Sequence, residues 1–93
     1  MAYPNPFDPN DAANPLKMLF SAATGEAVDI YVFDANGRVI WQKKDVDPNL
    51  SNRIVTWDGN TAWGETVENG LYLLRIVKQG KMVAKGKILV IKK

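Results

Sequence analysis

Apolar and polar residues alternate with a period of two through most of the chain, the pattern of strands that bury one face. The clearest case is Val28, Ile30 and Val32, each followed by a residue of the opposite face. The same pattern predicts further strands at residues 16–20, 38–44, 53–57, 71–77 and 82–91. No stretch keeps a helical repeat over about 11 residues. The pattern therefore predicts an all-β chain.

Glycine-containing turns separate these strands. Asn36-Gly37 predicts a type I′ hairpin turn, because both of its central residues tolerate positive φ. Gln79-Gly80 predicts a second tight turn. Asp58 can accept backbone N–H groups in an Asx turn. Tyr72 can act as a tyrosine corner, with its hydroxyl holding a loop.

Six or seven short strands with turns every 8–12 residues predict an immunoglobulin-like antiparallel β-sandwich of about seven strands. The inward positions of those strands give the expected core: Met18, Phe20, Val28, Ile30, Val32, Val39, Trp41, Val55, Trp57, Tyr72, Leu74, Ile76, Ile88 and Val90. In the last strand Met82 and Ala84 are expected to share the face of Ile88 and Val90.

The 93 residues are enough for one domain. Residues 1–15 hold four of the five prolines, so they are expected to form an extended Pro-rich N-terminal segment, with the sandwich domain at 16–93. Tyr3 and Phe7 are the large apolar side chains of that segment, and one or both are expected to pack on the rim.

Composition argues against an enzyme. The chain has no His and no Cys, which excludes cysteine nucleophiles and Ser-His-Asp relays and argues against a transition-metal site. The paired carboxylates at Asp45/Asp47 and Glu65/Glu68 fall in polar loops without a cleft between them. We expect no catalytic residue and no cofactor.

No apolar run reaches the ~18–20 residues of a transmembrane segment, and no signal peptide is recognisable.

Charge is unevenly distributed along the chain. Residues 71–93 contain no acid but seven cations, while residues 1–70 hold all ten acids. Outward lysines also discourage edge-to-edge pairing of strands, which is the simpler explanation for Lys78 and Lys81. For the lysines at 85, 87, 92 and 93 an interaction surface is equally well supported.

Four motifs in order resemble known bacterial families. They are Tyr3-Pro4-Asn5-Pro6-Phe7; Ile30-Tyr31 with 34–39; Trp57-Asp58-Gly59 with Gly64 and 69–72; and the terminal 86–92. Together they are similar to the FlgD-like Ig-like domain and to the C-terminal sorting domain of type IX secretion substrates. Trp57-Asp58-Gly59 favours the first family, and the terminal lysine pair favours the second.

The resemblance implies a non-catalytic C-terminal accessory or sorting domain of a larger bacterial protein, exported to the cell surface or the medium. Its partners would be secretion or surface-assembly proteins. The expected binding residues are Lys87, Ile91, Lys92 and Lys93, on a free terminal strand suited to strand addition. Because Lys92 and Lys93 are expected to be exposed and unpaired, their removal should hardly change stability.

Other functions stay open. The chain can be a structural spacer, or an adhesive module that binds polysaccharide through Trp63, unless Trp63 is a lid over the sandwich end. Asp8, Asn10 and Asp11, or Asp58 and Asn60, are oxygen ligands of the kind that calcium prefers, although such residues are more often turn formers. Nucleic acid is the least supported partner, because the basic region lacks interleaved aromatics. An exposed edge strand would permit dimers.

Overall fold

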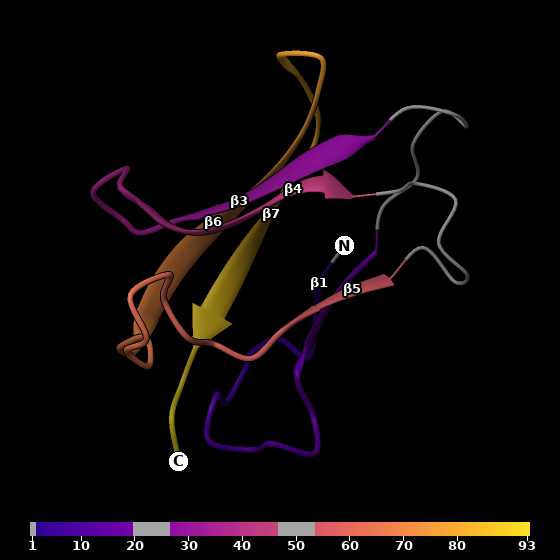
Figure 1. Cartoon of the computed structure of the whole chain (residues 1–93). Coiled ribbons are helices and arrows are strands. Elements are labelled where there is room, and N and C mark those ends of the chain that lie inside the picture. The colour runs from indigo at the N-terminus through magenta and orange to yellow at the C-terminus, as the bar shows by residue number, and fades with distance from the viewer. Residues whose placement is uncertain (1, 20–26, 47–53) are drawn as a thin grey trace.

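A computed structural model describes residues 2–19, 27–46 and 54–93. Its seven described strands form two antiparallel sheets that face each other (Figure 1). The prediction of an all-β, Ig-like sandwich is confirmed. Phe20, which we expected in the core, lies outside the described residues.

The smaller sheet has three strands in the order β1-β2-β5. They are β1 (Ala2–Tyr3), β2 (Leu16–Leu19) and β5 (Ile54–Trp57). Met18 pairs with Val55 and Leu16 with Trp57, so that four apolar side chains turn to the interior together. The alternation in the sequence predicted this face.

The larger sheet has four strands in the order β4-β3-β6-β7. They are β3 (Val28–Phe33), β4 (Val39–Val46), β6 (Gly70–Lys78) and β7 (Lys81–Val90). The central strands alternate without interruption: every second residue of β3 is buried, as are Tyr72, Leu74 and Ile76 of β6.

The core fills the space between the sheets, and no described polar or charged residue is buried in it. Burying one large aliphatic or aromatic side chain stabilises the fold by about 1.5–3 kcal/mol. Eleven predicted positions are confirmed: Met18, Val28, Ile30, Val32, Val55, Trp57, Tyr72, Leu74, Ile76, Ile88 and Val90. Trp41 is partly buried against the core, with its ring centroid 5.9 Å from that of Trp57.

Val39 was wrongly predicted to be buried, because β4 contains a bulge. Phe33 pairs with Val39 while Val32 pairs with Trp41, which leaves Ile40 as the extra residue. Ile40 is 2% exposed and Val39 is 38% exposed. The extra residue shifts the alternation of inward and outward side chains by one position. A single period-two pattern therefore does not describe both sides of the bulge.

A second bulge overturns the predicted face of Met82. Ile76 pairs with Ala84 and Val77 with Met82, so the register shifts between the two pairs. Met82 is consequently exposed on the outer face of the sheet, where its sulfur lies 3.5 Å from Nη1 of Arg75. Ala84 packs against the core as expected.

The N-terminal segment is bonded to both sheets. Tyr3 pairs with Lys17 of the smaller sheet, and Phe7 forms a parallel bridge with Val90 of the larger one. Phe7 is 1% exposed, with its ring centroid 5.9 Å from that of Trp57. Phe7 therefore belongs to the core itself and not only to its rim, while the boundary at residues 15 and 16 stays a prediction.

The two tight turns differ in conformation, and the type I′ turn is not at the predicted place. In the 34–38 hairpin only Gly37 has positive φ (84°), and Oδ1 of Asp34 accepts the N–H groups of Asn36 and Arg38. A type I′ turn requires two positive φ values, so that prediction is wrong for Asn36-Gly37. Gln79 (φ 50°) and Gly80 (φ 77°) meet the requirement instead.

Replacing Gln79 by asparagine is expected to stabilise the domain by about 1 kcal/mol, because the left-handed conformation costs most L-residues about 1–2 kcal/mol and asparagine adopts it more easily. Thermal or urea unfolding measures the change. The neighbouring substitution Lys81→Asn changes no residue of positive φ and serves as the control. An unchanged or lowered unfolding midpoint for Gln79→Asn would contradict the assignment of this turn.

Candidate recognition surface

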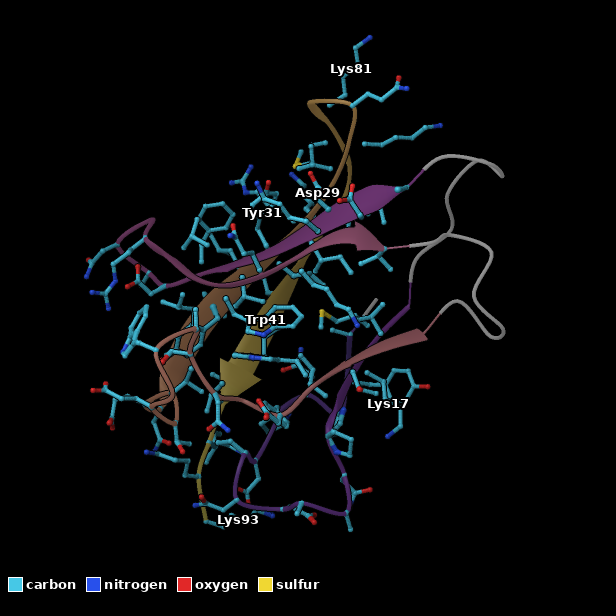
Figure 2. All side chains as sticks on the ribbon, viewed as in Figure 1. Lys17, Asp29, Tyr31, Trp41, Lys81 and Lys93 are labelled. Atoms are coloured by element: carbon cyan, nitrogen blue, oxygen red, sulfur yellow. The ribbon has the colours of Figure 1, made fainter. Side chains whose placement is uncertain are left out.

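The predicted C-terminal binding residues occupy different environments at the end of β7. Lys87 is exposed on the outer side of the sheet, and Ile91 keeps 42% of its surface exposed. Lys93 is exposed, but Lys92 is only partly so. Figure 2 shows Lys93 at the end of the molecule opposite to the hairpin that carries Lys81.

The outer edge of β7 is closed by the N-terminal segment along residues 87–91. The Asn5 side-chain amide donates to the Lys87 carbonyl oxygen (3.2 Å), and its Oδ1 accepts the Leu89 N–H (3.0 Å). The Phe7 N–H donates to the Leu89 carbonyl (2.7 Å), and the Phe7 carbonyl accepts the Ile91 N–H (3.0 Å). The prediction of a free terminal strand is therefore wrong here. A partner can reach the side chains of this stretch but not its edge, unless the segment leaves.

Lys92 is held by the loop that precedes β6. Its N–H donates to Oδ1 of Asn69 (2.8 Å), and its ammonium lies 3.5 Å from Oε2 of Glu68. The prediction that Lys92 is unpaired is wrong. The ion pair adds little, since Glu68 is largely exposed and such pairs contribute about 0–1 kcal/mol. The backbone bond fixes the direction in which the chain leaves the sheet.

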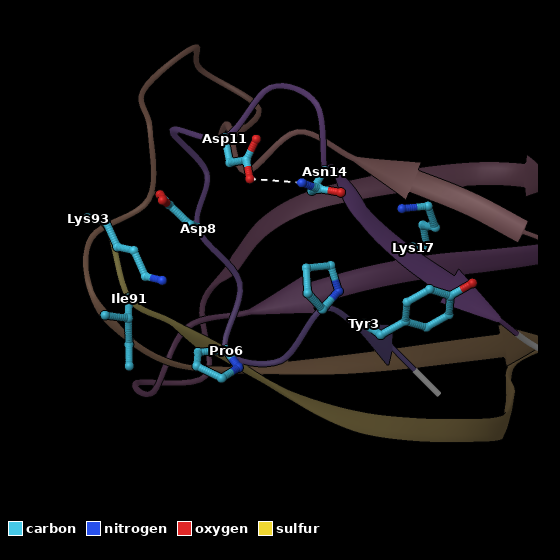
Figure 3. A pocket seen from close by; sticks show the side chains of 9 residues that line it. Tyr3, Pro6, Asp8, Asp11, Asn14, Lys17, Ile91 and Lys93 are labelled. Carbon is cyan, nitrogen blue, oxygen red and sulfur yellow. Dashed lines mark hydrogen bonds between the residues drawn. The ribbon is translucent and has the colours of Figure 1, made fainter.

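Ile91 and Lys93 line one side of a pocket of about 570 Å³, which we call the terminal pocket (Figure 3). Its other walls come from the N-terminal segment and β2: Tyr3, Pro4, Pro6, Asp8, Asp11, Asn14 and Lys17. The Lys17 ammonium lies 5.6 Å from the Tyr3 ring centroid. The pocket combines apolar proline and tyrosine faces with charges of both signs, a composition suited to a peptide or to a polar ligand with an apolar face.

Trp63 lies in a separate place, in the 58–69 loop. It keeps 49% of its surface exposed, so it does not close the sandwich end as a buried lid. The Arg38 guanidinium lies 5.0 Å from the ring centroid, and Arg38 is itself paired with Asp34 (3.3 Å). A cation over one face of the indole fixes the ring and leaves other parts of it accessible.

Two titratable groups border this loop. The Arg38 backbone N–H, helped by the N–H of Asn36 and by the Arg38 charge, lowers the pKa of Asp34. Because that pKa is depressed, the associated stability is present above the ordinary value of 3.8 and is lost as pH falls through the folded value. Burial raises the pKa of Tyr72, whose hydroxyl donates to the Glu68 carbonyl (2.8 Å). The predicted tyrosine corner is confirmed.

In an absorbance titration of the phenols we expect Tyr72 to ionise at higher pH than the free amino acid. Since its pKa is raised above 10.0, the associated stability is complete below pH 10 and is lost as pH rises through the folded value. Tyr72→Phe should remove the late step and lower the free energy of unfolding by about 1 kcal/mol. Tyr31→Phe is the control, and loss of the late step there instead would refute the assignment.

The candidate calcium ligands act as turn formers. Oδ1 of Asp8 accepts the Asn10 N–H, Oδ1 of Asp11 accepts the Ala13 N–H, and Oδ1 of Asp58 accepts the Asn60 N–H. The predicted Asx turn at Asp58 is thereby confirmed. Within the described ranges no group of three or more His, Cys, Asp and Glu residues is arranged to hold a metal ion. Those ranges also contain no helix long and apolar enough to cross a membrane.

Reasoning from sequence missed Asn5 as the residue that closes the β7 edge. Its side-chain amide donates one hydrogen bond to β7 and accepts one from β7, at Lys87 and Leu89, as the backbone of a neighbouring strand would. The sequence shows an asparagine between two prolines, but the residues around it do not indicate that it bonds to Leu89, more than 80 residues away.

No family model matches the chain, and no curated protein does. Solved structures do resemble it. PorZ of Porphyromonas gingivalis, described as an essential bacterial surface component of the type IX secretion system, superposes with a TM-score of 0.70 at 22% identity, over 99% of this chain and 11% of PorZ. Dimeric latent PorU from the same organism gives 0.68 at 20% identity, over 100% of this chain and 9% of PorU. The chain thus spans about a tenth of these proteins, and the likeness establishes the fold.

Proposed function

We propose that the chain is a non-catalytic accessory or sorting domain of a larger exported bacterial protein, recognised by secretion or surface-assembly machinery. The observation that carries the proposal is the end of β7, where Ile91 and Lys93 are presented beside the terminal pocket by a backbone bonded to Phe7 and Asn69. The similarity in fold to a domain-sized part of PorZ supports it. The chain would act outside the cell or on its surface.

Recognition would use side chains on a fixed backbone. The N-terminal segment occupies the strand edge at 87–91, so a partner gains little there from backbone pairing. Ile91 offers an exposed apolar side chain, and Lys93 places a cation on the same pocket. A partner with an apolar contact and a carboxylate at matching positions fits this arrangement.

The proposal includes no catalytic role, and three of the described carboxylates form turns instead of facing a common site. The carboxylates of Asp8 and Asp11 accept backbone N–H groups in turns, and Asp34 is bonded to its own hairpin. A hydrolase needs an acid and a base that face one site. A binding role therefore fits the domain better than an enzymatic one.

Export of a reporter fused to residues 1–93, in a bacterium with a type IX apparatus, tests the proposal. We expect loss of export, by about tenfold or more, when Ile91→Asp is combined with Lys93→Glu; tenfold corresponds to ~1.4 kcal/mol of recognition. Lys43→Glu combined with Val39→Asp, on the opposite edge strand, is the matched control. Equal export of all folded fusions, verified by thermal unfolding, would refute a sorting function.

A polysaccharide-binding module is the second candidate, favoured by the half-exposed indole of Trp63 under Arg38. In that case Trp63→Ala would abolish retention on insoluble polysaccharides and leave the unfolding temperature unchanged, whereas Tyr31→Ala would retain binding. Unaltered retention of the Trp63 variant would exclude this function.

A further inference from the structure

The outer face of the larger sheet carries apolar and cationic side chains that the sandwich does not cover. Residues of β3, β6 and β7 that alternate with the buried positions must point away from the core. Figure 2 shows the difference: Tyr31 and Asp29 lie on the far side of the sheet from Trp41, which sits between the layers. The outward positions of β6 and β7 include Leu71 and Leu89, which pair and are 45% and 39% exposed.

Four of these side chains form a square on β6 and β7. Leu73 pairs with Lys87, and Arg75 pairs with Lys85. They surround a hollow of about 360 Å³, whose floor is the paired strands at Leu74 and Gly86. We call this square and its hollow the outer patch. Its three cations border a space large enough for a side chain from another molecule.

The cations of the outer patch are not neutralised by described neighbours. Neither Lys85 nor Lys87 has an ion-pair partner among the residues that the structure describes. The Arg75 guanidinium lies over the ring of Phe33, 5.7 Å from the ring centroid, and this contact keeps the guanidinium on the outer face of the sheet. The described carboxylate on this side of β3 is Asp29, and its Oδ1 accepts the Asp45 N–H. The patch is therefore basic, with an apolar surround.

We propose that the outer patch binds an acidic segment of a partner protein, which presents carboxylates and a large apolar side chain on the same face. The carboxylates would meet Lys85, Lys87 and Arg75, and an apolar side chain would lie against Leu73 and the Phe33 ring. Charge complementarity favours an acidic occupant, because Lys85, Lys87 and Arg75 would repel a basic one. The Arg75 charge is held at the patch by its contact with the Phe33 ring. The exposed leucines at 71 and 89 favour a protein surface over a purely polar polyanion.

This surface is distinct from the terminal pocket, since Arg75 and Lys85 do not line that pocket. The inference goes beyond the proposed sorting function. Either can fail alone: export depends on Ile91 and Lys93, while the outer patch depends on Arg75 and Lys85.

The test is fluorescence anisotropy with a labelled peptide that carries glutamate and leucine at every second position with serine between them, so that both side chains point to one face of the extended peptide. Arg75→Gln combined with Lys85→Glu should weaken binding at least about tenfold, and raised salt should weaken wild-type binding. The control combines Lys81→Gln with Lys43→Glu, which makes the same change in net charge elsewhere, and it should stay within about twofold. In the wild type, peptide should shift the NMR amide signals of Leu73, Lys85 and Gly86.

Several results would overturn the proposal. Equal weakening by the control variant would mean attraction to net charge alone. Equally tight binding of polyglutamate, or of vesicles of anionic phospholipid, would assign the patch to polyanions or to membranes instead of an acidic protein segment. Absence of peptide binding by the folded wild-type domain would also refute it.

Discussion

Replacing Phe7 by alanine is expected to lower the free energy of unfolding by about 3–5 kcal/mol, the usual range for a buried phenylalanine. Phe7 is 1% exposed and packs against Trp57, although it belongs to an N-terminal segment of proline-rich sequence. A domain of this length has roughly 5–14 kcal/mol of stability in total. The substitution should therefore remove a large part of it, measured by urea unfolding with tryptophan fluorescence.

Tyr3→Ala is the control for Phe7. Tyr3 is only partly buried, at the edge of the smaller sheet, so its loss should cost clearly less. If Phe7→Ala cost under about 1 kcal/mol, as surface substitutions usually do, the packing of the N-terminal segment into the core would be contradicted.

Replacing Gly59 by alanine is expected to cost about 2–5 kcal/mol. Gly59 has a φ of 86°, which costs an L-residue about 1–2 kcal/mol. In addition, a Cβ atom there would lie 2.5 Å from Cβ of Pro9 and 3.0 Å from Cε2 of Phe7. Overpacking of this kind adds about 1–3 kcal/mol, because the crowded atoms belong to the core and to a rigid ring.

Gly64→Ala separates the two contributions. Gly64 has nearly the same φ, 91°, but no atom within 4 Å of the added Cβ. Gly64→Ala should therefore lower the free energy of unfolding only by the conformational cost of positive φ, about 1–2 kcal/mol. Equal losses for the two variants, measured by thermal unfolding, would show that the N-terminal segment does not crowd Gly59.

Local pattern predicted the regular strands well. β3 and β6 keep one alternation from end to end, so Val28, Ile30, Val32, Tyr72, Leu74 and Ile76 were placed correctly. The errors at Val39 and Met82 both come from bulges, which shift the alternation of inward and outward side chains by one position. No residue pattern in the sequence indicated where these bulges lie. Tyr72 and Asp58 were predictable because their bonds reach only a few residues.

The candidate site was less predictable, because its geometry depends on residues distant in sequence. The cations and Ile91 could be named from the terminal motif, and they stay predictions. That Asn5 and Phe7 close the edge beside Lys87 and Leu89 required the tertiary fold. Likewise, the three cations of the outer patch come together through the β6–β7 register, which sets Arg75 opposite Lys85 and Leu73 opposite Lys87.

The closure of the β7 edge by the N-terminal segment underlies both the stability and the recognition described above. Amide hydrogen exchange measured by NMR tests it most directly. The amides of Leu89 and Ile91 point to this edge and donate to Asn5 and Phe7, while that of Lys85 points to the same edge with no described acceptor. We expect strong protection of Leu89 and Ile91, fast exchange of Lys85, and loss of the Leu89 protection in Asn5→Ala. Exchange of Leu89 and Ile91 as fast as that of Lys85 would contradict the closure.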